Sequence, residues 1–350
     1  MVTALALDKN ETTLLDLVTS HQLPSYRQAY SDRTAWQMAC LSELAYQSFS
    51  GLDQDRTKRL LQDKLDDLLA HKRQDQLAEL IDAVSTVDAP HTQGLINSLA
   101  DHEMQVESCF DYKGTQALLI SSKTYLALVF RGTEATSFQD IKTDMKARKT
   151  QCPSKGGIHS GFHEAYELIA TQIQQELNQP QYAKKPLFIA GHSLGGALAT
   201  IAAKRLEHQG GIAACYSYGS PRVGDEEWSH GIKTPIFRLV NAIDCVTMLP
   251  PGGMFIKMVK FLLSFIPFFG TVIAQFLSAF EGYHHVGDMR YLTNCKPEIY
   301  DDVHLLTHVS LLRRLRIISR GKMAKHFIKD HSIAIYRKKL AVIALRHNQT

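Results

Sequence analysis

The feature that most constrains the fold is the segment 191–195, GHSLG, which has the form Gly-x-Ser-x-Gly. The preceding residues 186–190 (PLFIA) form a short apolar run with strand character, and residues 197–206 are mostly good helix formers. Ser193 therefore falls where a strand turns sharply into a helix, which is the context of a nucleophile elbow. The two outer glycines have no Cβ and allow a strained, closely packed turn. A glycine-rich turn without catalytic function is the alternative, and the flanking strand and helix argue against it.

A serine hydroxyl needs a histidine to take its proton and a carboxylate to orient that histidine. In α/β-hydrolases these groups follow in the order Ser, Asp or Glu, His, so both partners should lie downstream of Ser193. Asp244 follows the strand-like run 235–241, and open α/β sheets bind their ligands at the carboxyl ends of strands. The acidic cluster at 225–227 follows a turn and is typical of a solvated helix start. We therefore predict Asp244 as the acid.

The base is harder to identify, because the chain contains 16 histidines. Asp330 or Ser332 could cap the helix that follows them, which would place His331 at a loop-to-helix junction. His285 lies in the segment 283–287 (YHHVG), which could begin a strand. Placement alone favours His331 and leaves His285 open.

Four sequence blocks resemble the class 3 lipases, the filamentous-fungal-type triacylglycerol lipases and their bacterial relatives. They are 129–133 (VFRGT), 159–162 (HSGF), the elbow, and a block from 218–224 (YGSPRVG) through Arg238, Asn241 and Asp244 to 249–251 (LPP). Their order and spacing fit the family over about 120–251, and the stretches 41–46 and 330–336 fit more loosely. The resemblance implies an α/β-hydrolase fold, with a mostly parallel central sheet flanked by helices. It also implies hydrolysis of carboxylic esters through an acyl-enzyme.

By this resemblance Ser193 is the nucleophile, Asp244 the acid and His331 the base. His285 matches a His-Val-Gly block that is not catalytic in the family. The residues alone could not make that choice, so the assignment of His331 rests on the family motif.

The resemblance also implies an oxyanion hole made by Thr133 and the backbone N–H of Leu194. Attack on an ester places negative charge on the carbonyl oxygen, and losing one fixed donor typically costs ~10²–10³ in rate. A strand-end residue with a capping hydroxyl is the alternative interpretation of Thr133. Many relatives carry Asp-Trp after this block, whereas this chain has Asp140-Ile141, so the local packing of the lid region differs.

Residues 261–280 contain no charged side chain, and their length alone would allow a bilayer span. A proline and a glycine interrupt the run, and a span would separate the serine from its base, so we reject it. We expect 252–281 to form either a helical hairpin packed on the core or an apolar cap that opens against lipid. The charged loop at 134–156 is the other lid candidate, and the family places its lid there.

The C-terminal residues 311–350 contain eleven Lys and Arg residues and one acid, Asp330. This pattern is typical of a solvated helix face, and it would also suit a basic amphipathic surface that contacts anionic phospholipid headgroups. The expected partners are a lipid ester substrate and a lipid interface or membrane surface. Nucleic acid binding fits nothing else in the chain. No metal-ligand spacing appears, so we predict no metal and no cofactor.

The 350 residues suit a single α/β-hydrolase domain. A helix is expected over 34–49, and 52–85 is interpreted as a charged helical insertion. Three strands, at about 104–112, 115–122 and 124–130, should begin the sheet in antiparallel order. Strands and helices then alternate through 187–190, 213–218 and 236–240, as a mostly parallel sheet requires.

The leading functional hypothesis is a serine hydrolase of lipid esters, of the triacylglycerol lipase type. The alternatives are a phospholipase A1 acting at membranes, including a toxin-like effector, and a lipase-like binding module without catalysis. Residues 1–9 lack the basic start and apolar run of a secretory signal. This composition predicts a cytoplasmic protein or one exported by a signal-less route.

Overall fold

The computed structural model describes residues 5–20, 28–47, 89–132, 149–152, 155–253, 256, 282–296, 299–307, 309–310 and 329–348 of the chain. Its helices are α1 (Lys9–Ser20), α2 (Asp32–Leu44), α5 (Ala89–Asp101), α7 (Ser160–Leu177), α8 (Leu194–Arg205), α9 (Glu226–Ser229) and α14 (Ile333–Asn348), with short 3-10 turns at Pro180–Tyr182 and Val246–Met248. Its strands are β1 (Gln105–Tyr112), β2 (Thr115–Ser121), β3 (Leu126–Phe130), β4 (Lys149–Gln151), β5 (Gly157–His159), β6 (Leu187–His192), β7 (Ile212–Tyr218), β8 (Gly224–Asp225), β9 (Ile236–Asn241), β10 (Tyr283–His284), β11 (Asp288–Leu292) and β12 (Leu305–Leu306).

The centre of the molecule is an eight-stranded sheet in the order β1-β2-β3-β6-β7-β9-β11-β12. The strands from β3 to β11 in this order pair in parallel, β2 is antiparallel to both β1 and β3, and β12 is antiparallel to β11. Strands β3, β6 and β9 are buried along their whole length, as apolar strands of a doubly covered parallel sheet should be. The predicted antiparallel start and parallel continuation are both confirmed, and the fold is that of an α/β-hydrolase.

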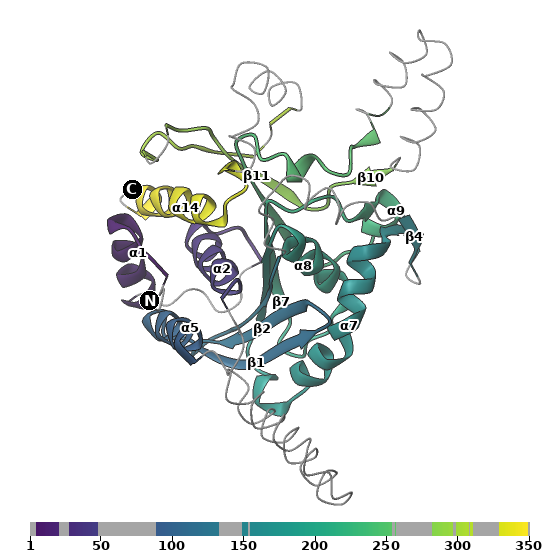
Figure 1. Cartoon of the computed structure of the whole chain (residues 1–350), viewed down its shortest axis with the longest axis horizontal. Helices are drawn as coiled ribbons and strands as arrows, with labels where there is room; N and C mark the ends of the chain where they lie inside the picture. The colour runs from purple at the N-terminus through teal and green to yellow at the C-terminus, as the bar shows by residue number, and fades with distance from the viewer. Residues whose placement is uncertain are drawn as a thin grey trace, which may run out of the picture.

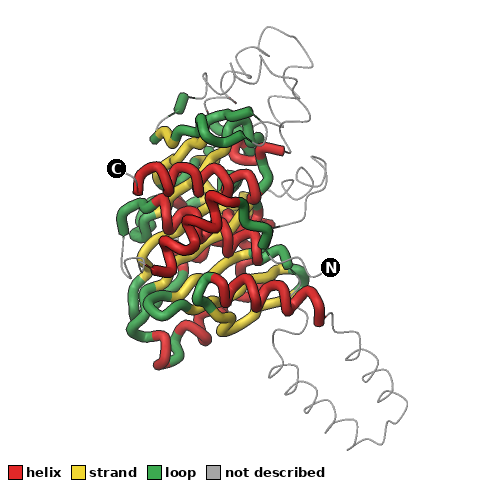
Figure 2. Tube along the Cα trace, turned by 90° about the vertical axis from the view of Figure 1, so that its left-hand side faces the viewer, coloured by secondary structure: helices red, strands yellow, loops and turns green. Residues whose placement is uncertain are grey.

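Helices cover both faces of this sheet, so the molecule has three layers (Figure 1). Helices α1, α2, α5 and α14 lie on one face and share one apolar core with the sheet. Helices α7 and α8 lie on the other face with a second core. Figure 2 looks onto the first face, with the red helices in front of the yellow strands. The two cores together fix the positions of the strand ends.

Helix α2 lies between the sheet and α14, which explains why nearly all of its residues are buried. Ser31 caps its N-terminus by accepting a hydrogen bond from the Thr34 N–H. The predicted helix over 34–49 is therefore confirmed, with bounds that begin two residues earlier at Asp32 and end at Leu44. The C-terminal end of α2 brings the following residues, among them Tyr46, to the edge of the candidate site.

A buried ion-pair cluster ties the first and last helices together. Arg337 of α14 donates to the Glu11 carboxylate of α1 and, at 2.7 Å, to the Glu43 carboxylate of α2. Arg337 and Glu11 are both almost completely buried. Because removing one partner of a buried pair leaves an uncompensated charge, we expect its loss to cost about 3–5 kcal/mol. The cluster therefore fixes α14, and with it the loop that precedes α14.

A second, four-stranded sheet has the order β10-β8-β5-β4. It lies at one end of the main sheet, beside α9 (Figure 1). Asp225 holds it together by accepting hydrogen bonds from the Gly157 N–H at 2.8 Å and the Trp228 N–H at 2.9 Å. The acidic cluster at 225–227 thus starts the short helix α9, as its sequence suggested.

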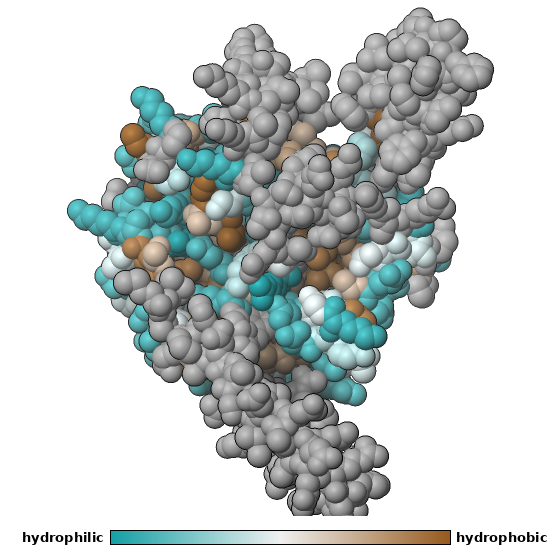
Figure 3. All heavy atoms as spheres, in the orientation of Figure 1, coloured by the Kyte–Doolittle hydropathy of each residue, from teal (hydrophilic) through white to brown (hydrophobic). Residues whose placement is uncertain are grey.

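Three of the segments predicted from the sequence lie wholly or mostly outside the described residues. The helical insertion at 52–85 and most of the apolar segment 252–281 are among them, as is the lid candidate at 134–156 apart from its last residues. Within the described part of the chain, no helix combines the length and apolar content that a membrane span requires. Hydrophilic residues cover much of the described surface in Figure 3, and its large exposed apolar side chains are only Ile96, Tyr112 and Ile299.

Candidate active site

The candidate nucleophile stands on a strained turn between β6 and α8. Ser193 has φ 58° and ψ −127°, a backbone conformation that a residue with a Cβ rarely adopts. The glycines on either side make room for it: a Cβ on Gly191 would lie 2.2 Å from the Gly195 carbonyl oxygen. A Cβ on Gly195 would lie 2.2 Å from the Phe130 carbonyl oxygen. The main chain thus presents Ser193 at the carboxyl end of β6, and the predicted elbow geometry is confirmed.

Three predicted side chains meet at this point. The Nε2 atom of His331 lies 2.9 Å from Ser193 Oγ, and its Nδ1 atom lies 3.0 Å from Asp244 Oδ2. A carboxylate can only accept, so Nδ1 carries the proton and Nε2 is free to accept the serine proton. Ser193, Asp244 and His331 are all buried. The arrangement can therefore remove a proton from a serine hydroxyl and stabilise the resulting imidazolium.

The carboxylate of Asp244 is completely buried and has further donors. The Tyr336 hydroxyl donates to Oδ2 at 2.6 Å, and the Val246 N–H donates to Oδ1 at 3.0 Å. Gly219 has φ 58° and leaves the space beside the pair open, since a Cβ there would lie 2.7 Å from Asp244 Oδ2. Asp244 is thereby held in one orientation towards His331.

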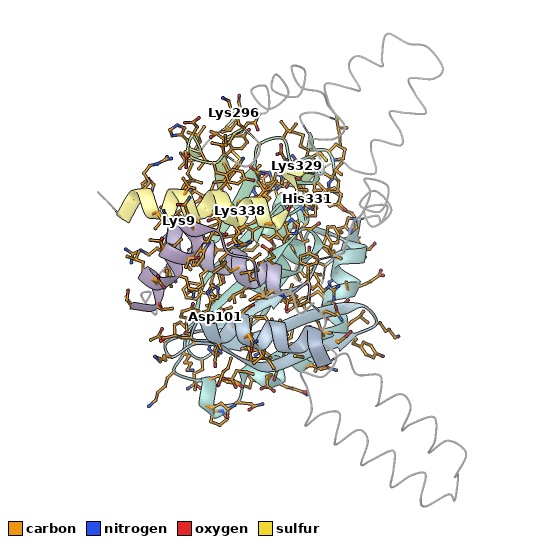
Figure 4. All side chains as sticks on the ribbon, turned by 60° about the vertical axis from the view of Figure 1, so that its left-hand side comes forward. Lys9, Asp101, Lys296, Lys329, His331 and Lys338 are labelled. Atoms are coloured by element: carbon orange, nitrogen blue, oxygen red, sulfur yellow. The ribbon has the colours of Figure 1, made fainter. Side chains whose placement is uncertain are left out.

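The base stands at the junction between a loop and α14, as predicted (Figure 4). The Asn241 side-chain amide at the end of β9 donates to the Asp330 carbonyl oxygen at 2.8 Å. The Asp330 carboxylate accepts a hydrogen bond from the Ile243 N–H at 3.3 Å. These contacts tie the loop before α14 to the strand that leads to Asp244, so the acid and the base are placed by one local network.

Of the predicted oxyanion-hole residues, Leu194 begins α8 directly after Ser193. The first N–H groups of a helix have no acceptor within the helix, so the N–H of Leu194 is suited to a developing negative charge. Thr133 lies outside the described residues. Its neighbour Gly132 stands against the elbow, because a Cβ there would lie 2.5 Å from the His192 carbonyl oxygen.

The rival residues lie elsewhere. The Nε2 atom of His285 contacts the Thr247 carbonyl oxygen at 2.7 Å, which makes this histidine a support for the loop after Asp244. The acidic cluster at 225–227 belongs to the small sheet and α9. Within the described ranges, no three His, Cys, Asp or Glu side chains are grouped as metal ligands.

Three side chains around the triad were not predicted from the sequence. They are Tyr336, His192 and Tyr46, whose hydroxyl lies 2.8 Å from His192 Nδ1. A polar side chain at a buried position of an apolar strand or helix was the available signal, since β6 and α14 are otherwise mostly apolar at their buried positions. That signal shows that a partner is needed and does not say which one.

The family model for class 3 lipases matches residues 127–254. The chain is 39% identical over 101 residues to the "Secreted mono- and diacylglycerol lipase 1" of Fusarium solani, which covers 27% of this chain and 30% of that protein. It is 30% identical over 184 residues to the "Lipase ZK262.3" of Caenorhabditis elegans, covering 48% of this chain and 49% of that protein. It is 34% identical over 148 residues to the "Lipase" of Rhizomucor miehei, covering 38% and 39%.

Solved structures of fungal lipases align with a larger share of the chain. The lipase of Rhizopus microsporus var. chinensis has a TM-score of 0.47 at 23% identity, covering 68% of this chain and 76% of that one. The Rhizomucor miehei lipase propeptide complex has a TM-score of 0.46 at 21% identity, covering 66% and 68%. The resemblance to the class 3 lipases is thus confirmed over residues 127–254, and the matches span less than half the length of the curated relatives.

The comparisons correct one expectation. The composition of residues 1–9 predicted a cytoplasmic protein or signal-less export, and this prediction is wrong. Relatives from Fusarium solani and Malassezia restricta are named secreted lipases. The first residues of the sequence were its only basis, and nothing in the fold or the candidate site supports it.

Proposed function

We propose that this chain is a serine hydrolase of the class 3 lipase type that cleaves the carboxylic ester bonds of acylglycerols. The observation that carries the proposal is the hydrogen-bonded chain from Ser193 through His331 to Asp244 at a nucleophile elbow. Ser193 and Asp244 lie inside the region that matches the class 3 lipase model. Relatives named mono- and diacylglycerol lipases support acylglycerols as the substrate class.

In the proposed reaction, Ser193 is the nucleophile and His331 the general base. His331 Nε2 takes the hydroxyl proton as Ser193 Oγ attacks the ester carbonyl carbon, and the former carbonyl oxygen becomes an oxyanion. The N–H of Leu194 and the predicted donor Thr133 stabilise that charge. His331 then gives its proton to the alcohol oxygen as the ester C–O bond breaks, which leaves an acyl group on Ser193.

Water completes the cycle. His331 takes a proton from a water molecule that attacks the acyl carbon, the bond to Ser193 Oγ breaks, and the fatty acid leaves as the serine recovers its proton. Throughout, Asp244 keeps the His331 ring in the tautomer with a free Nε2 and stabilises the imidazolium without taking its proton. The Tyr336 hydroxyl and the Val246 N–H, which donate to Asp244, keep that carboxylate in place.

We further propose that the chain forms a single α/β-hydrolase domain. Its apolar segment at 252–281 would bind the lipid interface. Acylglycerols form aggregates, so an enzyme acting on them has to bind a surface. The described residues favour neither a phospholipase A1 nor a binding module. An intact Ser-His-Asp arrangement argues against the second, because a binding module has no need to keep all three side chains in hydrogen-bonding contact.

The test is the rate of fatty acid release from emulsified tributyrin and from anionic phospholipid vesicles. The wild-type chain is compared with Ser193→Ala and with Ser217→Ala. Ser217 is a buried serine of β7 whose hydroxyl has no hydrogen-bond partner among the described residues, so it is a matched control. We expect release from tributyrin that disappears in Ser193→Ala and survives in Ser217→Ala. Faster release from the vesicles would identify a phospholipase, and equal rates for wild type and Ser193→Ala would contradict the mechanism.

A further inference from the structure

A second imidazole lies directly beside the proposed base. His192 is the last residue of β6 and is 5% exposed. Its Nε2 atom lies 2.6 Å from the backbone carbonyl oxygen of His331, and its Nδ1 atom lies 2.8 Å from the Tyr46 hydroxyl. The two imidazole centroids are 4.5 Å apart. His192 makes no hydrogen bond to the Ser193 hydroxyl, so the proton transfers of the proposed reaction do not pass through it.

The partners of His192 fix its tautomer. A carbonyl oxygen can only accept, so Nε2 carries the proton. The Nδ1 atom of a neutral ring is then a bare acceptor, and the Tyr46 hydroxyl donates to it. Burial lowers the pKa of His192 well below its usual value, and the neighbouring His331 lowers it further, against the opposing effect of the hydrogen bond to the His331 carbonyl. The ring is therefore neutral and can donate a hydrogen bond only through Nε2.

That one donor holds the main chain of the base. The triad contacts fix the His331 ring through its two nitrogens, whereas the contact from His192 fixes its carbonyl group. The preceding carbonyl, of Asp330, accepts from the Asn241 side chain. Two successive carbonyls of the base loop are thus held by side chains at the ends of β6 and β9. These strands also lead directly to Ser193 and Asp244, so the loop is aligned with both.

Tyr46 also contacts the residues that follow β3. A Cβ on Gly132 would lie 2.3 Å from the Tyr46 hydroxyl oxygen, so the glycine after β3 leaves the space that the hydroxyl occupies. The Arg131 guanidinium lies over the Tyr46 ring at 5.9 Å from its centroid. Residues 131 and 132 lead into the predicted oxyanion donor Thr133. Tyr46 therefore connects the end of β3 with His192.

We propose that His192, oriented by Tyr46, is a positioning residue that holds the main chain of His331 for proton transfer. This inference rests on the proposed function, because it concerns the base of that reaction. Among the described residues, the titratable side chains that face the His192 ring are Tyr46, His331 and Tyr336, with Asp244 on the far side of His331. A neutral ring at this position leaves the imidazolium that forms on His331 without a second positive charge beside it.

The first test compares two substitutions of similar size, with a water-soluble p-nitrophenyl butyrate as the substrate. His192→Gln keeps an N–H donor within reach of the His331 carbonyl, and His192→Leu removes it. Since a misplacement of about 1 Å can cost ~10²-fold, we expect His192→Leu to lower kcat by about 10- to 100-fold with KM nearly unchanged. We expect His192→Gln to recover most of that loss, and Tyr46→Phe to fall between them.

The matched control is His102→Leu. His102 is a buried histidine at 3% exposure that packs against Trp36 with tilted rings, in the layer of α2 and away from the triad. It should leave kcat unchanged, and thermal unfolding of every variant shows whether the fold survives. Equal kcat for wild type and a folded His192→Leu would overturn the positioning role. A wild type without any turnover would overturn the proposed function, and the spectroscopic test below then decides the role of His192.

The second test needs no activity. In ¹⁵N NMR of histidine-labelled protein, the imidazole signals that are lost in His192→Gln should show a protonated Nε2 and a bare Nδ1 at pH values below the usual pKa of a histidine. A His192 signal that titrates between about pH 6 and 7 would contradict a neutral ring donating to the His331 carbonyl.

Discussion

The nucleophile and the base of the candidate site are held in different ways. Ser193 is fixed by its main chain, because two glycines and a positive φ leave the turn between β6 and α8 one conformation. His331 comes from 138 residues further along the chain and is fixed by side chains. Its ring is held by Asp244, and its loop is held by Asn241 and His192. One half of the site is therefore encoded locally and the other half depends on tertiary contacts.

This difference predicts that substitutions in the two halves fail in different ways. A change at the elbow alters backbone sterics and should lower stability and activity together. A change in the side-chain network should lower activity while the fold survives, because each bond there is one of several that hold the loop.

The largest effect is expected for Asp244→Asn. An asparagine can turn its amide group towards His331, which would favour the tautomer that lacks a free Nε2, and we expect kcat to fall by about 10⁴-fold. The melting temperature should change much less, because the new side chain has the same size. The measurement is kcat for a soluble ester alongside thermal unfolding.

Asp225→Asn is the matched control for that experiment. Asp225 is the other candidate acid and caps α9 without contacting the triad. It should retain nearly full activity. Comparable losses of kcat in Asp225→Asn and Asp244→Asn would contradict the assignment of the acid.

The next effect concerns the elbow. Gly195→Ala would place a Cβ 2.2 Å from the Phe130 carbonyl oxygen, so β3 and α8 have to move apart. We expect a loss of about 1–3 kcal/mol in the free energy of unfolding. We also expect activity to fall by ~10²-fold, because Ser193 moves with α8. Chemical denaturation and ester hydrolysis measure the two quantities.

Gly253→Ala is the control for the elbow, since a Cβ there meets no described residue within 4 Å. It should behave like the wild type in chemical denaturation and in hydrolysis of a soluble ester, neither of which involves the lipid interface proposed for 252–281. An active and equally stable Gly195→Ala variant would show that the elbow tolerates movement, and the contrast between the two halves of the site would be lost.

The sequence predicts the locally encoded half of the site better than the half that depends on tertiary contacts. The elbow was predicted because strand, turn and helix signals are local to Ser193. Asp244 was predicted because it follows β9, and strand ends are where such sheets place ligands. The residues alone left His331 and His285 open, because the position of a base 87 residues after the acid depends on how α14 docks. The family motif made that choice, and the geometry agrees with it.

The docking of α14 has causes that no local pattern reveals. Arg337 is held by Glu11 and Glu43 from the opposite end of the sequence. His192 and Tyr46 are 146 residues apart, and their contact follows from the packing of α2 on β6. The periodic spacing of hydrophobic residues predicts that these helices are buried against the sheet, but it does not predict which polar side chains form hydrogen bonds with each other.

A third prediction concerns the helix layer formed by α1, α2, α5 and α14. It tests whether the stability of this layer can change while the chemistry of the triad stays the same. Burial lowers the pKa of His102, which packs against Trp36 of α2, to about 4. Between pH 6.5 and 4 the unfolded chain binds a proton that the folded chain excludes. Stability is therefore lost as the pH falls through this range, by about 2 kcal/mol between pH 7 and 5. His102→Leu should remove that share of the acid sensitivity.

The measurement is the free energy of unfolding of wild type and His102→Leu at both pH values. The acid limb of the pH–rate profile should be the same in the two proteins, because His102 does not touch the triad. An unchanged pH dependence of stability in His102→Leu would contradict the depressed pKa. A shifted acid limb would show that the helix layer and the base are coupled more closely than the contacts suggest.

The smallest effect is expected for Tyr336→Phe. The hydroxyl donates to Asp244 at 2.6 Å and accepts the Asn241 N–H at 2.9 Å, so its loss removes one of the donors to the acid and leaves Val246 in place. A hydrogen bond to a charged group is worth about 1.5–3 kcal/mol, and we expect kcat to fall by about 10-fold, since the other bonds retain the geometry. Tyr218→Phe is the matched control, because Tyr218 packs edge-on against Tyr336 and donates to Ala35 instead. If Tyr336→Phe lost as much activity as Asp244→Asn, the side-chain half of the site would be as intolerant of change as the elbow. If the loss is partial, the base owes its position to several bonds of which each supplies only a share.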